Sequence, residues 1–164
     1  MQGVIVQVSI SLGGLPKRAV SGGLITPLGI EGDLHSHSAI HGGPLKAILL
    51  VASEVIEDLI ARGYPLFCGA LGENLTTRGI TFRDIRIGDR LRAGGATLEI
   101  TAPRGPCSGL DVYGESLKEE ISDERVRALD HTSPRWGQCG FYASVVEPGP
   151  VRPDDIIAVL AKLA

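Results

Sequence analysis

Apolar and polar side chains alternate over the first ten residues of the chain. The apolar positions on one side of this pattern are Val4, Val6, Val8 and Ile10. A period of two predicts a β-strand, and Ile5 adds an apolar residue to the other face, so we expect the start of the strand to be covered on both sides. From residue 11 to residue 32 glycines and a proline divide the chain into short extended pieces, which is typical of a barrel meander.

The middle of the chain predicts one buried strand followed by one helix. Ala47 to Val51 is a continuous apolar run, and Ser53 directly after it is a good N-cap residue. The spacing of the next apolar residues predicts a helix with one apolar face, made of Val55, Ile56, Leu59 and Ile60. Gly63 stands where a helix C-terminal stop is expected.

The second half of the chain predicts mainly strands, with one helical stretch. The expected elements are strands over 85–92 and 96–101 around a Gly94-Gly95 hairpin, one or two short amphipathic helices over 116–130, and strands over 141–147 and 156–160 separated by a turn at 148–150. Between the first helix and the hairpin, Glu73 and Asn74 are expected in a turn between apolar residues. The pattern as a whole indicates a mainly β domain.

Composition narrows the class of protein. A chain of 164 residues fits one domain with a core that needs no disulfide or metal, and its 22 glycines agree with a β-rich fold with many tight turns. The longest apolar run, 47–52, is too short to span a membrane, and a net charge of −3 without a basic stripe argues against nucleic acid. Three cysteines at unrelated spacings and the lack of a signal-like start predict a reducing cytoplasm.

Cys107 is the candidate for the reacting atom. It lies in a loop after the expected strand 96–101, and a thiolate is both a nucleophile and a soft metal ligand when a nearby cation favours it. Arg104 can supply that cation, while Pro103, Gly105 and Pro106 keep the loop extended. The residues alone leave a structural cysteine in a turn equally open.

Three of the four histidines fall in a long segment between residues 32 and 46. Asp33, His35, His37 and His41 form a candidate zinc or iron site, with solvated histidines as the alternative. The same segment ends in a candidate anion-binding turn, because Gly42 and Gly43 let backbone N–H groups approach an oxyanion and Lys46 adds a charge.

Glu73 and Asn74 form another candidate pair, since a carboxylate beside an amide can read the edge of a heterocycle. The alternative is an ordinary Asx turn. Ser9, Ser11 and Ser108 show no nucleophile-elbow pattern, which argues against a serine hydrolase.

Several segments, taken in order, resemble the motifs of the MOSC family, the domain named after the C-terminal part of molybdenum cofactor sulfurases. They cover nearly the whole chain and are Gly29 to Asp33, His41 to Ala47, Leu71 to Thr76, Ile87 to Asp89, Pro103 to Cys107, and Gly140 to Ala143 before Glu147 to Gly149. Their ordered combination, rather than any one motif, makes the resemblance specific. It implies a single MOSC domain over residues 1–164, of the stand-alone type, folded as a strongly bent β-barrel with a few peripheral helices.

The resemblance also implies a role for Cys107, which in this family either binds molybdenum in the molybdenum cofactor (molybdopterin) or carries sulfur as a persulfide. On the first hypothesis Lys46 and Arg104 neutralise the pterin phosphate, Asn74 and the His41-Gly42-Gly43 turn read the pterin, and Glu73 belongs to the same site. The activity would then be that of a reductase of N-hydroxylated compounds.

On the second hypothesis Cys107 passes sulfur on during cofactor maturation, as a sulfurtransferase-like protein would. The third hypothesis is the histidine-ligated zinc or iron enzyme. The expected partners are a small-molecule cofactor or substrate and a sulfur donor or an electron-transfer protein. The family's reductases carry extra segments beyond the core that this chain matches, and the pair His35 and His37 lies outside the family motifs, so no family role transfers to it.

Overall fold

The computed structural model of the chain describes residues 1–34 and 42–161. Strands make up most of the regular secondary structure of these residues, as the alternating pattern predicts. The strands are β1 (Gln2–Ile10), β2 (Arg18–Val20), β3 (Gly23–Thr26), β4 (Gly29–Ile30), β5 (Ile48–Ala52), β6 (Leu75–Arg78), β7 (Arg90–Ala93), β8 (Ala96–Pro103), β9 (Phe141–Glu147), β10 (Gly149–Val151) and β11 (Ile156–Val159). The helices are α1 (Ser53–Ala61), α2 (Leu117–Ile121) and α3 (Glu124–Arg127), with 3-10 turns η1 (Pro44–Lys46), η2 (Phe82–Asp84) and η3 (Ser108–Tyr113).

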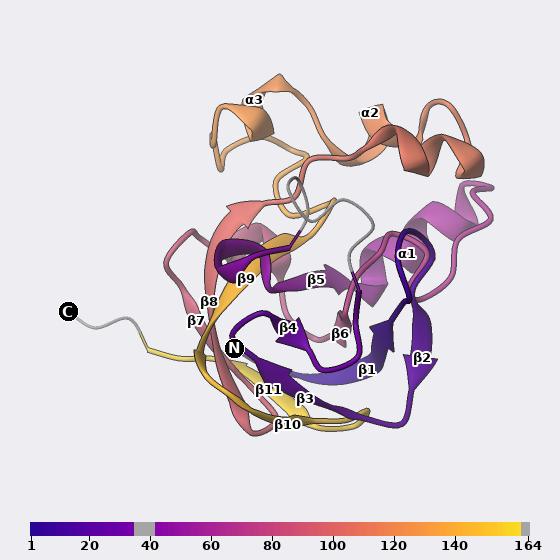
Figure 1. Ribbon diagram of the computed structural model, residues 1–164. Coiled ribbons are helices and arrows are strands. Elements are labelled where there is room, and N and C mark those ends of the chain that lie inside the picture. Colours follow the sequence, from indigo (N-terminus) through magenta and orange to yellow (C-terminus); the bar gives the residue numbers. More distant parts are fainter. Residues whose placement is uncertain (35–41, 162–164) are drawn as a thin grey trace.

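Seven strands close into a barrel in the order β11, β7, β8, β9, β5, β6 and β1, and β1 pairs with β11 to complete the ring (Figure 1). β2 extends β1 on the outside of this ring, and a small second sheet has the order β10, β3 and β4. All barrel pairings are antiparallel except that between β5 and β6. The predicted fold, a mainly β and strongly bent barrel with few helices, is therefore confirmed.

A β-bulge in β1 explains which of its side chains enter the core. Ile5 pairs with Thr77 and Gln7 with Thr76, so the register shifts between them. Ile5 and Val8 are both fully buried although they are three residues apart, whereas Val4 is 40% exposed. A bulge adds one residue to one strand, which breaks the period of two. The strand prediction was right, and the phase of the alternation changes at the bulge.

The predicted strand and helix in the middle of the chain are present, with two corrections. Every residue of β5 is buried. The strands β6 and β9 cover its two edges, one of its faces points into the barrel interior, and α1 covers the other. The N-cap of α1 is Ala52. Ser53 is already inside the helix, and its hydroxyl donates a hydrogen bond to the carboxylate of Glu54. Ile60 is exposed, so only the other three predicted residues form the buried face of α1.

Two other predicted boundaries were wrong. Residues 85–89 form a turn after η2, and the strand begins only at Arg90. Gly149 and Pro150, expected in a turn over 148–150, belong with Val151 to β10, which pairs with β3. Gly149 makes this possible, because a Cβ there would lie 2.2 Å from the carbonyl oxygen of Gly95. The chain can pass that close to the β7–β8 hairpin only with glycine at this position.

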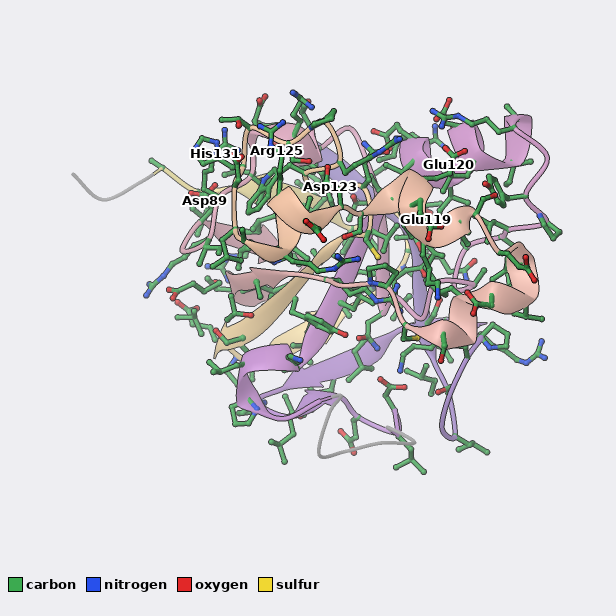
Figure 2. All side chains as sticks on the ribbon, turned by 90° about the horizontal axis from the view of Figure 1, so that it is seen from above. Asp89, Glu119, Glu120, Asp123, Arg125 and His131 are labelled. Carbon is green, nitrogen blue, oxygen red and sulfur yellow. The ribbon has the colours of Figure 1, made fainter. Side chains whose placement is uncertain are left out.

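The predicted helical stretch 116–130 forms two short helices, α2 and α3, which lie together beyond one end of the barrel (Figure 1). They bury Leu117, Ile121 and Val126, while Asp123 caps α3 by accepting the backbone N–H of Val126. Figure 2 looks onto this layer and shows Glu119 on α2. None of the helices within the described residues is long and apolar enough to cross a membrane.

Candidate functional site

The loop with Cys107 and the loop before β9 leave the barrel side by side. Pro103, the last residue of β8, pairs with Phe141, the first residue of β9. One residue further on, the backbone N–H of Arg104 donates to the carbonyl of Gly140 at 2.9 Å. Antiparallel pairing therefore brings Cys107 and Cys139, both free thiols, to the same edge of the barrel.

The side chain of Arg104 lies between these loops and is almost completely buried, with 3% of the residue exposed. Its Nη1 donates to Sγ of Cys139 at 3.5 Å, and its buried Nε has no hydrogen-bond partner among the described residues. Burial acts to lower the pKa of Arg104, but Cys139, Tyr142 and Cys107 together outweigh it and raise the pKa. The guanidinium is thus a buried cation that interacts electrostatically with two thiols and a phenol.

Tyr142 connects Arg104 to the predicted anion-binding turn. The Nζ of Lys46 lies 5.1 Å from the centre of the Tyr142 ring, which is the geometry of a cation–π contact. Burial raises the pKa of Tyr142, and the hydrogen bond and charge of Arg104 oppose that rise. Lys46, Tyr142 and Arg104 therefore form a continuous row, which places both predicted phosphate-binding cations on the same side of the barrel.

The Gly42-Gly43 turn precedes Lys46 in a backbone conformation that suits glycine. The φ angles are 86° at Gly42 and 82° at Gly43, and a Cβ at Gly43 would meet no atom within 4 Å. Among the described residues no atom therefore lies against this side of Gly43. His41, the other predicted member of the turn, lies outside the described residues.

Glu73, predicted in a turn between apolar residues, is fully buried two residues before β6. Its Oε1 accepts the backbone N–H of Gly69 at 2.5 Å and the hydroxyl of Thr76 at 3.1 Å, while Oε2 has no hydrogen-bond partner in the described part of the chain. Burial raises the pKa of Glu73, and the hydrogen bonds and the charge of Arg104 act in the opposite direction. A buried carboxylate oxygen and a buried guanidinium N–H are thus both left unpartnered near the thiols.

Asn74 has a structural role in the described geometry. Its amide nitrogen donates to the carbonyl of Ser9 at 3.3 Å and to Oδ2 of Asp33 at 2.8 Å, and its amide oxygen accepts the backbone N–H of Leu49. Asp33 in turn forms a buried ion pair with Lys17 at 2.7 Å. Both amide hydrogens of Asn74 are occupied, and a role in reading a pterin stays a prediction.

The predicted histidine-based metal site falls largely outside the described residues, because His35, His37 and His41 all lie in the segment 35–41. Its fourth member, Asp33, uses its carboxylate on Lys17, Asn74 and the backbone N–H of Ser11. Within residues 1–34 and 42–161 no group of three or more His, Cys, Asp or Glu residues is placed to hold a metal ion.

Sequence reasoning missed Cys139, Tyr142 and Leu15. Cys139 and Tyr142 reach Arg104 only because β8 pairs with β9, and strand register between distant segments cannot be read from one sequence. Leu15 packs against the backbone at Gly109 and Gly72. A Cβ added at Gly109 would lie 3.3 Å from Cδ1 of Leu15, and a Cβ added at Gly72 would lie 2.4 Å from its Cδ2. Only the family motif that contains Tyr142 gave a signal for this part of the site.

A groove of about 460 Å³ adjoins the cysteine loop on the side of α2 and α3. It is lined by Pro106 and by Lys118, Glu119, Ser122, Asp123, Glu124 and Arg127. A larger groove of about 750 Å³ lies along β10 and the β7–β8 hairpin and includes Arg92 and Arg152 in its lining. The first of the two therefore offers the closer approach to Cys107.

Comparison with known families gives one match that covers most of the chain. The family model of the MOSC domain matches residues 37–158, which include Lys46, Glu73, Arg104 and Cys107. The match includes the strands β5 to β9 and both loops that carry the thiols.

Curated relatives agree with this family. The chain is 32% identical to protein YiiM of Escherichia coli over 86% of its own length and 60% of that protein, and 32% identical to protein YflK of Bacillus subtilis over 93% and 65%. It is also 31% identical to a protein of Gibberella moniliformis named as a reductase, over 82% of this chain and 23% of that protein. The chain thus spans less than two thirds of the length of each of these relatives.

Solved structures share the fold. YiiM from Geobacillus stearothermophilus superposes with a TM-score of 0.73 at 25% identity, over 97% of this chain and 75% of that one. YiiM from Escherichia coli gives a TM-score of 0.68 at 28% identity, over 100% and 72%. The YUAD protein of Bacillus subtilis, with a TM-score of 0.73 at 20% identity over 99% and 98%, shows likeness of fold.

Proposed function

Because this chain belongs to the MOSC domain family, we propose that it binds the molybdenum cofactor where Cys107, Arg104 and Lys46 lie on one side of the barrel. The family is associated with binding of this cofactor in general. The cofactor combines a soft metal, a hydrogen-bonding pterin and a phosphate. These groups are bound by a thiolate, by hydrogen-bond donors and acceptors, and by cations, respectively. The described residues offer all three kinds.

The single observation that carries the proposal is that, of the five buried side-chain atoms without a hydrogen-bond partner among the described residues, the two that belong to charged groups both lie in this site; the other three are hydroxyls. Arg104 Nε and Glu73 Oε2 are both buried without a hydrogen bond from the described residues. Buried polar groups without a partner cost free energy, so such atoms are rare in native proteins outside sites that receive a ligand or water. The first is a hydrogen-bond donor on a cation and the second is a hydrogen-bond acceptor. Together they fit a ligand with both anionic and N–H groups.

Each residue has a defined task in this proposal. Cys107, which is only partly buried, is the metal thiolate. Arg104 and Lys46 hold the phosphate, and the Gly42-Gly43 turn directly before Lys46 supplies backbone N–H groups to it. Glu73 accepts an N–H of the pterin through Oε2, while Asn74 keeps the Asp33–Lys17 pair in place behind it.

When bound, the cofactor would supply two-electron redox chemistry, and we infer that the activity is the reduction of N-hydroxylated compounds. A relative is named as a reductase, which supports this reaction class. The groove beside Pro106 is the route by which a substrate would approach Cys107. Its lining of both cations and carboxylates favours a polar substrate.

The proposal is tested by reconstitution of the purified chain with released molybdenum cofactor. We expect molybdenum and pterin fluorescence to elute together with the protein from a gel-filtration column, in equal amounts. Reconstituted protein should then oxidise a chemical reductant in the presence of an N-hydroxylated amidine. Protein that elutes with neither metal nor pterin contradicts the proposal, and protein that binds both but reduces nothing contradicts the reaction class alone.

A second function is favoured by the thiol chemistry of the same loop. Cys107 is partly accessible and lies near the cation of Arg104, which are the properties of a cysteine that accepts sulfur. As a sulfur carrier it would form a persulfide and pass the outer sulfur to an acceptor. Intact mass decides: after incubation with a cysteine desulfurase and cysteine, one added sulfur on Cys107 supports this function, and an unchanged mass rules it out.

A further inference from the structure

Two cysteines share one buried guanidinium. Arg104 donates to Sγ of Cys139, and the charge of Arg104 also interacts with the thiol of Cys107. The two thiols interact electrostatically with each other as well. Their loops are joined by the Pro103–Phe141 pairing and by the hydrogen bond from Arg104 N to Gly140 O. The sulfur atoms therefore belong to one cluster, although 32 positions separate them in the sequence.

The two thiols differ in accessibility. Cys139 is 2% exposed, whereas Cys107 is half-buried at the rim of the loop. Residues 104–107 have no regular secondary structure, and a Cβ at Gly105 would meet no atom within 4 Å. The backbone on the Cys107 side can therefore adjust, while Cys139 is held in place by the strand that follows it and by Arg104.

A purely structural role does not account for Cys139. A cysteine that only fills the core has apolar neighbours, but this one accepts a hydrogen bond from a buried cation. No carboxylate lies within ion-pair distance of Arg104 among the described residues, so sulfur takes the place of the usual anionic partner. Burial raises the pKa of Cys139, and the charge and hydrogen bond of Arg104 act against that rise, so this donor favours the thiolate that forms during a reaction.

We propose that Cys139 is the resolving thiol of Cys107, and that the two close a disulfide when a hydroperoxide oxidises the site. In the first step the Cys107 thiolate attacks the outer oxygen of the peroxide. The O–O bond breaks, Cys107 becomes a sulfenic acid, and alkoxide or hydroxide leaves. In the second step the Cys139 thiolate attacks the Cys107 sulfur, and hydroxide leaves. Two thiols and one peroxide thus give one disulfide, one water and one alcohol or a second water.

The consequence is reversible protection of the site. A sulfenic acid left alone is oxidised further to irreversible forms, whereas a disulfide is returned to two thiols by a thiol reductant. The closed form lacks the free Cys107 thiol, so it binds neither metal nor sulfur. This inference requires no bound cofactor and goes beyond the proposed function.

The test uses the full chain, with and without Cys68→Ser, which leaves Cys107 and Cys139 as the two remaining cysteines. Reduced protein is treated with one equivalent of hydrogen peroxide, unreacted thiols are blocked, and peptides are mapped without reduction. We expect a peptide cross-linked between Cys107 and Cys139, and an intact mass lower by two hydrogens. Both signals should disappear after treatment with dithiothreitol.

Two variants separate the roles of the thiols. In Cys139→Ala we expect Cys107 to accumulate as a sulfenic acid that reacts with dimedone, and then to over-oxidise. In Cys107→Ser we expect Cys139 to remain a thiol, because it is buried. A wild-type chain that accumulates the dimedone adduct without the cross-link overturns the proposal, as does a cross-link that contains Cys68.

Discussion

Nη1 of Arg104 lies 3.5 Å from Sγ of Cys139, so a buried cation has a sulfur atom as its hydrogen-bond acceptor. Glu73 is a buried carboxylate that interacts with the charge of Arg104 and has one oxygen unpartnered among the described residues. These two residues make the interior of the site polar, but they do not form an ion pair with each other. The site can therefore accept a charged ligand.

The fork of donors on Arg104 is expected to matter more than its charge. Arg104→Lys keeps the positive charge but removes the Nε donor and the planar geometry. A hydrogen bond to a charged group contributes about 1.5–3 kcal/mol, so the affinity for the cofactor should fall roughly ten- to a hundredfold. Pterin fluorescence titration measures this, with Arg83→Lys as the exposed control. Equal affinities of wild type and Arg104→Lys would exclude a direct contact.

The raised pKa of Glu73 predicts how stability depends on pH. Above its unfolded pKa the unfolded chain loses the proton while folded Glu73 keeps it, so the folded state binds more protons. The free energy of unfolding should therefore decrease as pH rises from the unfolded pKa through the folded one. Glu73→Gln removes this dependence, and its stability relative to wild type should increase over that pH range. Urea unfolding of both proteins at several pH values tests the sign.

The buried ion pair of Lys17 and Asp33 should stabilise the base of the site. Lys17→Met leaves the Asp33 carboxylate, whose side chain is 1% exposed, without its cation. Loss of one partner of a buried pair costs about 3–5 kcal/mol. The double variant Lys17→Met/Asp33→Asn should recover part of that loss.

A surface pair provides the matched control. Arg90 and Glu99 are paired at 2.8 Å but are about half and one third exposed, so Arg90→Met should cost less than about 1 kcal/mol. Chemical denaturation of the variants gives the comparison. A Lys17→Met chain as stable as Arg90→Met would show that the buried pair contributes nothing.

Two glycines of the site allow a test of space against backbone strain. Gly43 has φ 82° and ψ 173°, which suits glycine, but a Cβ there meets open space, so Gly43→Ala should cost about 1–3 kcal/mol. Gly140 has φ 87°, and its Cβ would also lie 2.2 Å from the carbonyl oxygen of Leu50, so Gly140→Ala should cost about 4 kcal/mol from strain and overpacking together. Thermal unfolding that ranks Gly43→Ala as the less stable variant would refute this reading of the two positions.

Local patterns predicted the features of the fold that depend on neighbouring residues. The run of β5, the buried face of α1 and the cysteine in a Pro/Gly loop with Arg104 are all of this kind. The bulge between Ile5 and Gln7 was not predictable, because it depends on how β1 pairs with β6. The β10 pairing with β3 was missed for the same reason.

The site shows the same division. Cys107, Arg104 and Lys46 were proposed from residue type and spacing, whereas Cys139 joins the candidate site only through the register of β8 and β9. In the sequence, Glu73 and Asn74 have the pattern of turn residues. Their burial was not predictable, because it follows from the way their loop packs across the barrel end. The family resemblance supplied the order of the motifs but gave no role for Cys139.

The central claim, that the Cys107 thiol holds the metal of a pterin cofactor, is tested most directly by one comparison. Molybdenum and pterin are measured in wild type, Cys107→Ser and Cys68→Ser after identical reconstitution and gel filtration. We predict equal metal and pterin in wild type and Cys68→Ser, and loss of at least most of the metal from Cys107→Ser. Metal content in Cys107→Ser equal to that of wild type would contradict the claim.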